Sequence, residues 1–520
     1  MRILFFLWLS VLGIPLHAQH LLGLTPSNYA GTNALAHNPA FVVDSRYKVY
    51  INLVGNDFFV INNYVSYDAP FSLLKLMNRS VPNEYKSSAG KVVFKEDYLQ
   101  ENINGNDKRA HFGGDLRGPS VLFSINDKQA LALTSRVRYG VNMNGFSEPV
   151  ANLLRFGPGN HDYVPRSADN QHFALNANGY MEVGLTYGRV LVNDGDWFVK
   201  VGASVKRLVG LYNLHLNSPN ASYEVVPSVV DPTKVSVRVQ NSAFLYGYTD
   251  QGSYKDFLPT PRFLTGKDAA GGGWAFDIGF VYEYRPDFSK YDYIDEKHKK
   301  RLDPSQNKYK YRLAVSLVDW GFLRYNNAKY VGQYSIQGRD FTIDESYFTN
   351  LKDANGVTYG FDRTFYVYNL PKNTSFAAAL PSSIQASFDS QIRDKVYMNL
   401  FWVQNVVGDF QVGMKQQSQL AVTPRYESRW FEFALPVALL DQYSRLSIGA
   451  ATRLGPLTVG TDHLGGLLNL GKPRGLDFYF NVAVPIFQKR PPSPLMCPPW
   501  QEEKPRFWQK VQFWKNKKRR

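Results

Sequence analysis

Alternation of apolar and polar side chains recurs along this chain in segments of about ten to thirteen residues. Residues 273–284, GWAFDIGFVYEY, place Asp277 and Glu283 on one face and a row of large apolar side chains on the other. A tilted strand of about ten residues crosses a bilayer, and barrel strands alternate in this way. The pattern predicts an all-β, transmembrane antiparallel barrel. A soluble β-sandwich also alternates, but no domain linker interrupts residues 46–487.

The first 19 residues are typical of a secretory signal. A basic start, an apolar core and a small residue, Ala18, precede an expected cut before Gln19. After the signal no 18-residue apolar run occurs, which excludes a helical membrane protein. We therefore expect export to the outer membrane of a Gram-negative cell. The single cysteine, Cys497, rules out an internal disulfide framework, although it could pair with another chain.

Counting strands backwards from the last alternating segment predicts fourteen, with short periplasmic turns and long outer connections. The expected strands cover residues 46–66, 118–126, 129–141, 178–192, 196–212, 272–284, 309–324, 380–390, 394–406, 417–423, 429–437, 443–454, 456–464 and 475–487. The long connections are 67–117, 142–177, 213–271 and 325–379. One connection breaks the pattern: residues 285–308 are long and charged at the periplasmic end, and residues 291–302 are compatible with a short helix.

The first strand admits two interpretations. Gly55-Asn56 has the composition of a hairpin turn, but a hairpin there would make fifteen strands. A single strand bent at Gly55 gives fourteen. In that strand the apolar residues from Val49 to Val65 keep one phase, which only Asp57 disturbs.

Several segments carry a resemblance to known barrels. NALAHNPAF before the first strand resembles the start of FadL-like outer-membrane barrels, in which an Asn-Pro-Ala turn follows a lumenal plug. The segments KYKYRLAVSLVDWG, LPSSIQASFDSQI, TPRYESRWFEFALP and RLGPLTVGTDHLGGLLNLGKPRGLDFYFNVAVPIF are similar to a Bacteroidota barrel family, domain of unknown function 5723. The resemblance spans residues 28–487 and implies a fourteen-strand barrel related to FadL and PorV-type proteins. It implies no established activity.

The barrel phase predicts which charged residues line the lumen. These are Arg136, Arg138, Glu182, Lys200, Lys206, Asp277, Glu283, Lys310, Arg312, Glu432, Arg445, Arg453 and Asp477. They are compatible with a charged path for anionic or amphipathic solutes. They are equally compatible with a lumen closed by salt bridges, because barrel interiors are polar by default.

Residues 20–45, which lie before the first strand, are predicted to form a plug. Its candidate residues are Asn28, Gly31, Asn33, Asn38 and Pro39. A fourteen-strand barrel is wide enough to need filling or to conduct, because eight strands already enclose a side-chain-filled interior. The sequence does not distinguish a gate from a static stopper.

The C-terminal tail, residues 488–520, holds ten basic and two acidic residues, and so carries +8 of the net charge of +15. A short amphipathic helix is expected over residues 505–516. Its candidate docking residues are Phe507, Trp508, Val511, Trp514, Lys517 and Lys518. The composition suits an anionic lipid surface, a periplasmic protein or cell-wall component, or a solvated tail.

No nucleophile elbow, paired-histidine metal motif, phosphate loop or dinucleotide fingerprint occurs, so the sequence predicts no enzyme, metal or cofactor. Asp462-His463 has no serine partner at a recognisable spacing. A nucleic-acid partner is not expected of an exported barrel, despite the basic charge. The sequence favours a gated channel or transporter for small amphipathic or anionic solutes. The alternative is a non-conducting structural partner of an envelope machine that docks through barrel and tail.

Overall fold

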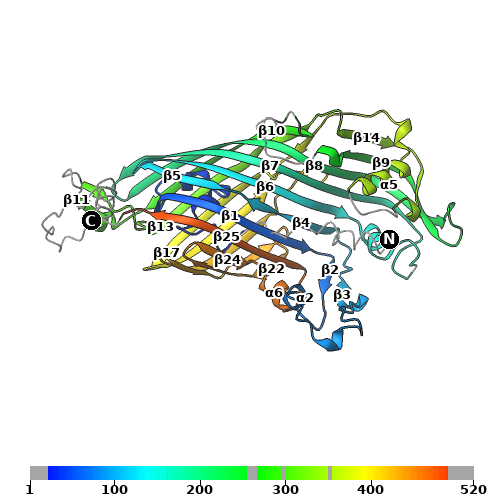
Figure 1. Ribbon diagram of the computed structural model, residues 1–520, viewed down its shortest axis with the longest axis horizontal. Helices are drawn as coiled ribbons and strands as arrows, with labels where there is room; N and C mark the ends of the chain where they lie inside the picture. Colours follow the sequence, from blue (N-terminus) through cyan, green and yellow to red (C-terminus); the bar gives the residue numbers. More distant parts are fainter. Residues whose placement is uncertain are drawn as a thin grey trace, which may run out of the picture.

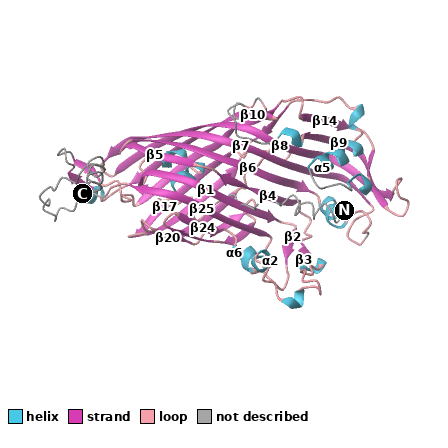
Figure 2. Ribbon diagram, viewed as in Figure 1, coloured by secondary structure: helices cyan, strands magenta, loops and turns pink. Residues whose placement is uncertain are grey.

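A closed antiparallel β-barrel forms the body of the molecule (Figures 1 and 2). The computed structural model describes residues 21–489 except 161, 254–265, 267, 295–299 and 349–353. Over these residues fourteen strands, some with a short break, pair with their neighbours, and the last pairs with the first. The predicted fold class and strand number are confirmed.

The barrel strands, with each broken strand given as two labels, are β1 (Tyr47–Asn62), β4 (Lys108–Arg117) with β5 (Ser120–Asn126), β6 (Gln129–Phe146), β7 (Ser167–Asp194), β8 (Trp197–Pro227), β10 (Gly271–Tyr284), β13 (Tyr311–Tyr325), β16 (Phe376–Ala379) with β17 (Ser383–Arg393), β18 (Val396–Asn405), β19 (Gln419–Glu427), β20 (Phe431–Ala434) with β21 (Val437–Leu440), β22 (Arg445–Ile448) with β23 (Ala450–Leu454), β24 (Leu457–Thr461) and β25 (Gly475–Phe487).

Short turns lie at one end of the barrel and long connections mostly at the other. Turns of two or three residues join β5 to β6, β7 to β8, β17 to β18, β19 to β20 and β23 to β24. Gly195 and Gly455 take positive φ angles of 54° and 57° in two of these turns, a conformation that glycine adopts without strain. In outer-membrane barrels short turns face the periplasm, so this end is the periplasmic end.

The described part of the long connection at the periplasmic end, residues 285–294 and 300–310, does not contain the expected helix. It holds η6 (Phe288–Tyr291) and a small hairpin of β11 (Asp292–Ile294) and β12 (Lys300–Leu302). The helix prediction for residues 291–302 is therefore wrong. Aromatic and β-branched residues favour strands, and an isolated helix this short is marginal in water.

The first strand is unbroken, as predicted. β1 runs through Gly55-Asn56 without a hairpin and pairs along one edge with β25. Its other edge pairs with β4 and β5. The strand therefore closes the barrel over its whole length.

The predicted single phase along β1 is wrong. The register with β25 shifts just before Val54, and Leu53 and Val54 are both exposed on the outside. An extra residue in one strand moves the following side chains to the opposite face. Phe59 and Ile61 consequently pack inside the barrel, rather than outside in phase with Val49.

Additional strands extend the barrel's own sheet beyond the membrane at the outer end (Figure 1). β7 and β8 are much longer than predicted, and β8 continues into pairing with β9 (Val235–Thr249). β14 (Val331–Gln337) and β15 (Phe341–Ile343) then pair with β9. The predicted long loops 213–271 and 325–379 thus contain strands, because their apolar residues bury an extramembrane core with α3 (Glu148–Phe156), α5 (Ala354–Thr364) and η8 (Val367–Asn369).

The remaining short elements lie in the outer connections. They are β2 (Val65–Tyr67), α2 (Leu73–Met77), η3 (Asn83–Tyr85), η4 (Glu96–Tyr98), β3 (Leu99–Glu101), η5 (Gln251–Ser253), η7 (Glu345–Phe348) and α6 (Leu464–Leu468). β2 pairs with β3, and a small apolar cluster around Phe71 packs beside them. α2 and α6 contact each other beside this hairpin (Figures 1 and 2).

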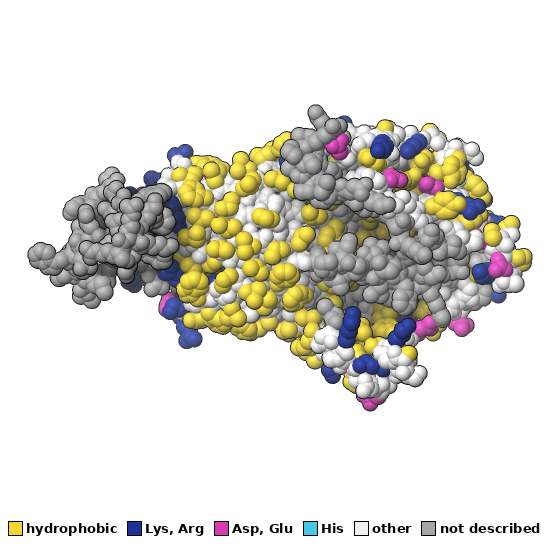
Figure 3. All heavy atoms as spheres, in the orientation of Figure 1, with side chains coloured by type: hydrophobic (Ala, Val, Ile, Leu, Met, Phe, Trp, Pro, Cys, Tyr) yellow, Lys and Arg dark blue, Asp and Glu magenta, His cyan; other side chains and the backbone are white. Residues whose placement is uncertain are grey.

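Large apolar side chains form a band on the face of the barrel that Figure 3 shows, and exposed apolar residues occur on strands all around the barrel. The members include Leu133, Leu185, Trp274, Ile278, Trp320, Phe322, Leu400, Phe433, Leu446, Phe478 and Val484, all exposed. Within the described residues, no helix is long and apolar enough to cross a membrane. An exposed apolar belt around a closed barrel with a polar interior is the architecture of an outer-membrane protein.

Candidate functional site in the barrel interior

The N-terminal segment, residues 21–45, is buried against the inner face of the barrel. It contains two 3-10 helices, η1 (Gly31–Ala36) and η2 (Pro39–Val42). Leu22 and Leu24 pack with inward-facing residues of β18, β19 and β21, whereas η2 contacts β7, β8 and β10. The Asn38 side chain caps η2 by accepting a hydrogen bond from the Ala40 amide at 2.9 Å. The segment therefore contacts opposite sides of the wall.

Glycines on β7, β8 and β10 allow η2 to approach the wall. They are Gly188, Gly202 and Gly279, and a Cβ atom added at any of them would lie less than 3.0 Å from residues 38–42. At Gly202 the obstructing atoms belong to the Pro39 backbone, which cannot rotate away. The absence of side chains at these positions fixes where the N-terminal segment lies.

We expect Gly202→Ala to destabilise the folded barrel by about 1–3 kcal/mol, because the added methyl group overpacks against Pro39. Urea unfolding of the refolded protein in detergent measures the change. Gly179→Ala is the matched control on β7, since its Cβ would find its nearest neighbour at 3.8 Å. Equal unfolding midpoints for the two variants would show that η2 does not press on β8.

Hydrogen bonds from side chains tie the N-terminal segment to the wall. The Asn38 Nδ2 group donates to the Val315 carbonyl at 3.0 Å. On the other side of the barrel, the Leu22 amide donates to Asp462 Oδ2 at 2.9 Å. Ser27 Oγ donates to a wall carboxylate, Glu432, at 2.8 Å. None of the strand pairings described includes residues 21–45, so the segment can leave without breaking a strand ladder.

A central cluster of buried ions lies beside η1. Its members are Asp57, Asp115, Arg117, Arg136, Arg138, Glu182, Lys206, Asp277 and Asp319. Asp319 connects its two halves, because its carboxylate lies 2.6 Å from Arg138 and 2.6 Å from Lys206. Its positive φ of 56° coincides with a register shift between β10 and β13 opposite Asp277. Each ion has a partner of opposite charge, as burial requires.

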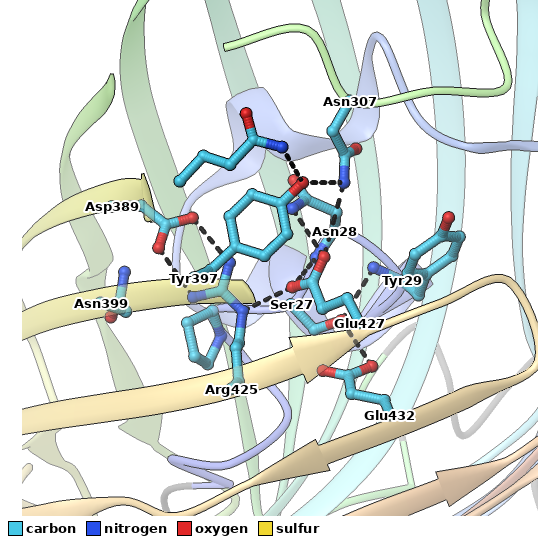
Figure 4. A network of polar contacts seen from close by, with 12 residues as sticks. Ser27, Asn28, Tyr29, Asn307, Asp389, Tyr397, Asn399, Arg425, Glu427 and Glu432 are labelled. Carbon is cyan, nitrogen blue, oxygen red and sulfur yellow. Dashed lines mark hydrogen bonds and ion pairs between the residues drawn. The ribbon is translucent and has the colours of Figure 1, made fainter. Parts of the chain in front are cut away.

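A second cluster surrounds Asp389 (Figure 4). Arg425 donates two hydrogen bonds of 2.7 Å to its carboxylate, and Arg312 donates a third at 2.9 Å. Arg425 also bonds Glu427, which in turn accepts from the Asn28 side chain at 2.8 Å. The cluster thus joins the wall to the N-terminal segment through a continuous set of charged contacts.

A third cluster lies at the periplasmic end. Its members are Asp44, Arg46, Lys200, Glu283, Arg285 and Lys308. Arg285 lies 2.6 Å from Asp44, and Arg46 lies 3.0 Å from it. Burial alone would raise the pKa of Asp44, but Arg46 and Arg285 outweigh burial and hold that pKa well below its usual range. Asp44 is therefore ionised.

A strap crosses the lumen from the outer side. It is the β18–β19 connection, residues 406–418, whose backbone bonds reach the distant strands β6, β7 and β8. The Gly413 and Lys415 amides donate to the side chains of Asn176 and Asn142 at 3.2 and 3.1 Å. Asn217 donates to the Phe410 carbonyl at 2.9 Å. Two separate pieces of chain therefore fill the barrel.

The structure brings most of the predicted charged residues together in these clusters. Arg136, Arg138, Glu182, Lys206 and Asp277 lie in the central cluster, Arg312, Glu432 and Arg453 near Asp389, and Lys200 and Glu283 at the periplasmic end. Asp477 accepts from the Asp462 amide at 2.8 Å. Two residues are placed apart: Lys310 donates to the Gln391 carbonyl at the periplasmic rim, and Arg445 begins β22 at the outer rim. Both are only half-buried.

Three further plug candidates, Asn28, Asn33 and Gly31, also contact the wall. Asn28 bonds Glu427 and Arg312, Asn33 accepts from Arg117 at 3.2 Å, and Gly31, at a φ of 61°, faces the Tyr50 ring. The tail candidates Phe507 to Lys518, the signal and Cys497 lie outside the described residues.

Several partners in these clusters were missed in the sequence. They are Asp115, Asp319, Asp389, Arg425, Glu427 and Arg285. Three of them, Asp115, Asp389 and Arg425, lie on the polar side of predicted strands or just beyond the strand ends. Extending the list of inward-facing charged residues by a few positions would have included them. Asp319 sits at the bulge and follows no phase.

Within the described residues, no group of three or more His, Cys, Asp and Glu side chains could hold a metal ion. The polar side chains inside the barrel form ion pairs and hydrogen bonds with one another.

Solved structures similar to this chain are themselves barrels. They include the TodX deltaS2S3 mutant monoaromatic hydrocarbon channel, with TM-score 0.37, 9% identity and coverage of 88% of this chain and 94% of that chain. A Pseudomonas aeruginosa FadL homologue has a TM-score of 0.28 and 8% identity, with 86% of this chain and 93% of that chain covered. The translocator domain of autotransporter NalP from Neisseria meningitidis has a TM-score of 0.27 and 7% identity, with 87% of this chain and 91% of that chain covered. At TM-scores this low, the fold assignment rests on the strand pairing of the chain itself.

No curated protein matches the chain. One family model does, and its match begins at Pro39 in η2 and ends at Asp462, the residue that holds the Leu22 amide. The match covers residues 39–462, which is most of the chain and nearly all of the barrel. The chain therefore belongs to the family of unknown function DUF5723, as its resemblance predicted.

Proposed function

We propose that this protein is a plugged outer-membrane channel or transporter for small anionic or amphipathic solutes. The observation that carries the proposal is the ionised interior. Barrel interiors are polar by default, but replacing buried ion pairs by apolar residues is often neutral or stabilising, so a purely structural barrel does not require this many buried charges. Ionisable residues inside a membrane protein typically mark a solute path.

The cavities beside the N-terminal segment support this proposal. One is lined by Asn33, Arg117, Arg136, Lys206 and Asp277. Another is lined by His37, Arg138, Asp319, Gln385 and Gln419 and reaches towards the strap. Charged and amide groups therefore face empty space on more than one side of the segment, where a polar solute could bind as the segment moves.

The segment and the strap act as two closures in this proposal. Both are held mainly by hydrogen bonds and side-chain packing, and both can move while the barrel strands stay paired. A solute would pass the strap first and the N-terminal segment last.

Solute influx into liposomes tests the proposal. The purified protein is reconstituted, and influx of a small carboxylate such as propionate is compared with influx of a neutral molecule of similar size. Faster influx of the carboxylate than in protein-free liposomes is expected. A barrel that is folded, as shown by its heat-dependent migration on a gel, but passes neither solute would contradict the proposal.

A second candidate function is a non-conducting partner of an envelope machine, favoured by the extramembrane sheet. β9, β14, β15 and α5 build a hydrophobic core of their own outside the barrel, which a simple pore does not require. Capture of a partner protein by the full chain, lost when residues 331–343 are replaced by a short Gly-Ser linker, would support this candidate if solute influx is absent.

A further inference from the structure

A cavity at the periplasmic end lies between the N-terminal segment and the barrel wall. The cavity is small, with a volume of about 30 Å³, and it opens to solvent. The N-terminal segment supplies one side, with Phe41 among its residues. The wall supplies Lys200, Glu283 and Arg312, and the β10–β13 connection supplies Lys308. The cavity therefore touches both the fixed and the detachable part of the structure.

The charges around this cavity are unbalanced. The ionisable lining residues are four basic groups, Arg46, Lys200, Lys308 and Arg312, and two carboxylates, Asp44 and Glu283. Arg312 is also paired with Asp389 outside the lining, which Arg425 shares. Both carboxylates are also bonded to Arg285, which lies behind them. Buried charge without a counter-charge is costly, so the excess of cations favours an anion in the cavity.

Two of these cations have hydrogen-bonding capacity to spare. The Arg312 side chain is buried, since the residue is only 6% exposed, and its Nε group has no hydrogen-bond partner. Lys308 Nζ donates to the Gln306 carbonyl at 3.1 Å, and its nearest carboxylate oxygen, on Asp44, is 4.0 Å away. An ammonium group can donate three hydrogen bonds. The donors needed to bind an oxyanion are therefore already present.

We propose that this cavity is a binding site for an oxyanion group, a carboxylate or a phosphate, held chiefly by Lys308 and Arg312 and bridging the N-terminal segment to the barrel wall. Lys200 adds positive charge from β8, and its ammonium lies 5.7 Å from the centre of the Phe41 ring. The Phe41 ring offers an apolar surface for the part of a solute behind its charged end. The site does not depend on whether the lumen conducts.

The protonation of Lys308 supports a pH-dependent affinity. Burial lowers the pKa of Lys308 to about 7, and Arg46 and Arg285 reinforce this effect, while Asp44 and Glu283 oppose it. Lys308 is thus charged below pH 7 and increasingly neutral above it. An anion bound beside it favours the charged form, so the anion should bind more tightly at pH 6 than at pH 8.5.

Calorimetric titration of the full-length protein in detergent tests the site. The probes are sulfate and acetate, whose charges stay constant between pH 6 and 8.5. We expect saturable binding that weakens by about ten-fold or more in Lys308→Gln, because a hydrogen bond to a charged group is lost. Lys290→Gln is the matched control, since it removes the same charge from an exposed lysine at the same end. Lys308→Arg should retain most of the affinity.

The outcomes are separable. Loss of the pH dependence in Lys308→Gln, with the fold verified by heat-dependent gel migration, supports the assignment. Octanoate binding more tightly than acetate would identify the anion as the head of an amphipathic solute, and equal affinities would identify a free small anion. Absence of binding by the unmodified protein at millimolar probe, or equal weakening in Lys308→Gln and Lys290→Gln, would overturn the proposal. Liposome influx is measured separately, so failure of transport does not count against the site.

Discussion

Removal of both the N-terminal segment and the strap is expected to turn a nearly closed barrel into a steady pore. The test uses planar bilayers and three variants: deletion of residues 21–45, replacement of residues 408–415 by a short Gly-Ser linker, and the two changes combined. We expect the combined variant to conduct on the order of ten-fold more than the unmodified protein, because a fourteen-strand barrel is too wide for its own wall side chains to fill.

The two single variants distinguish the two closures. The N-terminal segment contacts β7, β8 and β10 on one side and bonds Asp462 on the other, so the strap alone cannot replace it. The strap spans the outer lumen through Asn142 and Asn176. Each single deletion should therefore raise conductance by less than the combined deletion. A combined variant that folds but stays silent would show that the wall itself closes the lumen and would favour a structural role.

Asp389→Asn is expected to destabilise the barrel by about 3–5 kcal/mol, the second large effect. Asp389 is fully buried and accepts hydrogen bonds from Arg425, Arg312 and Tyr309. Neutralising it leaves two guanidinium groups with too little negative charge, and breaking a buried pair costs this much. Urea unfolding in lipid vesicles, followed by tryptophan fluorescence, provides the measurement.

A matched control and a double variant make this result specific. Asp394→Asn removes the same charge from a side chain that is 86% exposed in the next turn, and should leave the midpoint unchanged. Combining Asp389→Asn with Arg425→Gln should cost less than the sum of the single changes, since the second removes the cation that the first left unpaired. Strict additivity would mean that the two groups do not interact as the 2.7 Å contacts indicate.

The sequence predicted the barrel well because alternation is a direct consequence of having lipid on one face and a polar interior on the other. Phe276, Ile278 and Phe280 point outward and Asp277 and Glu283 inward, as their phase required. The fourteen strands and the unbroken first strand followed from the same signal. The phase failed in β1 because one extra residue near Val54 reverses the faces without changing composition.

Other features depend on contacts between distant parts of the chain. The structure has strands β9 and β14 where the sequence predicts loops, because their apolar residues bury a core outside the membrane and carry no barrel phase. The strap has no distinctive residue pattern, since its backbone amides make the decisive bonds to Asn142 and Asn176. Lys308 was not a candidate because its cavity forms only when the N-terminal segment is inside the barrel. The alternation within one strand does not indicate which distant segments will contact that strand.

The bond between Leu22 and Asp462 bears on how the protein is assembled. It joins residues 440 positions apart, and barrel closure pairs Ile51 with Val484 at a similar separation. Contacts this distant along the chain form late, because the loop between them must first be ordered. A chain truncated before β24 would keep its N-terminal segment but lack the carboxylate that receives it. The N-terminal segment can therefore settle in the lumen only after the last strands have joined the barrel. In an incompletely assembled barrel the segment stays free, and we expect proteases to cleave it there.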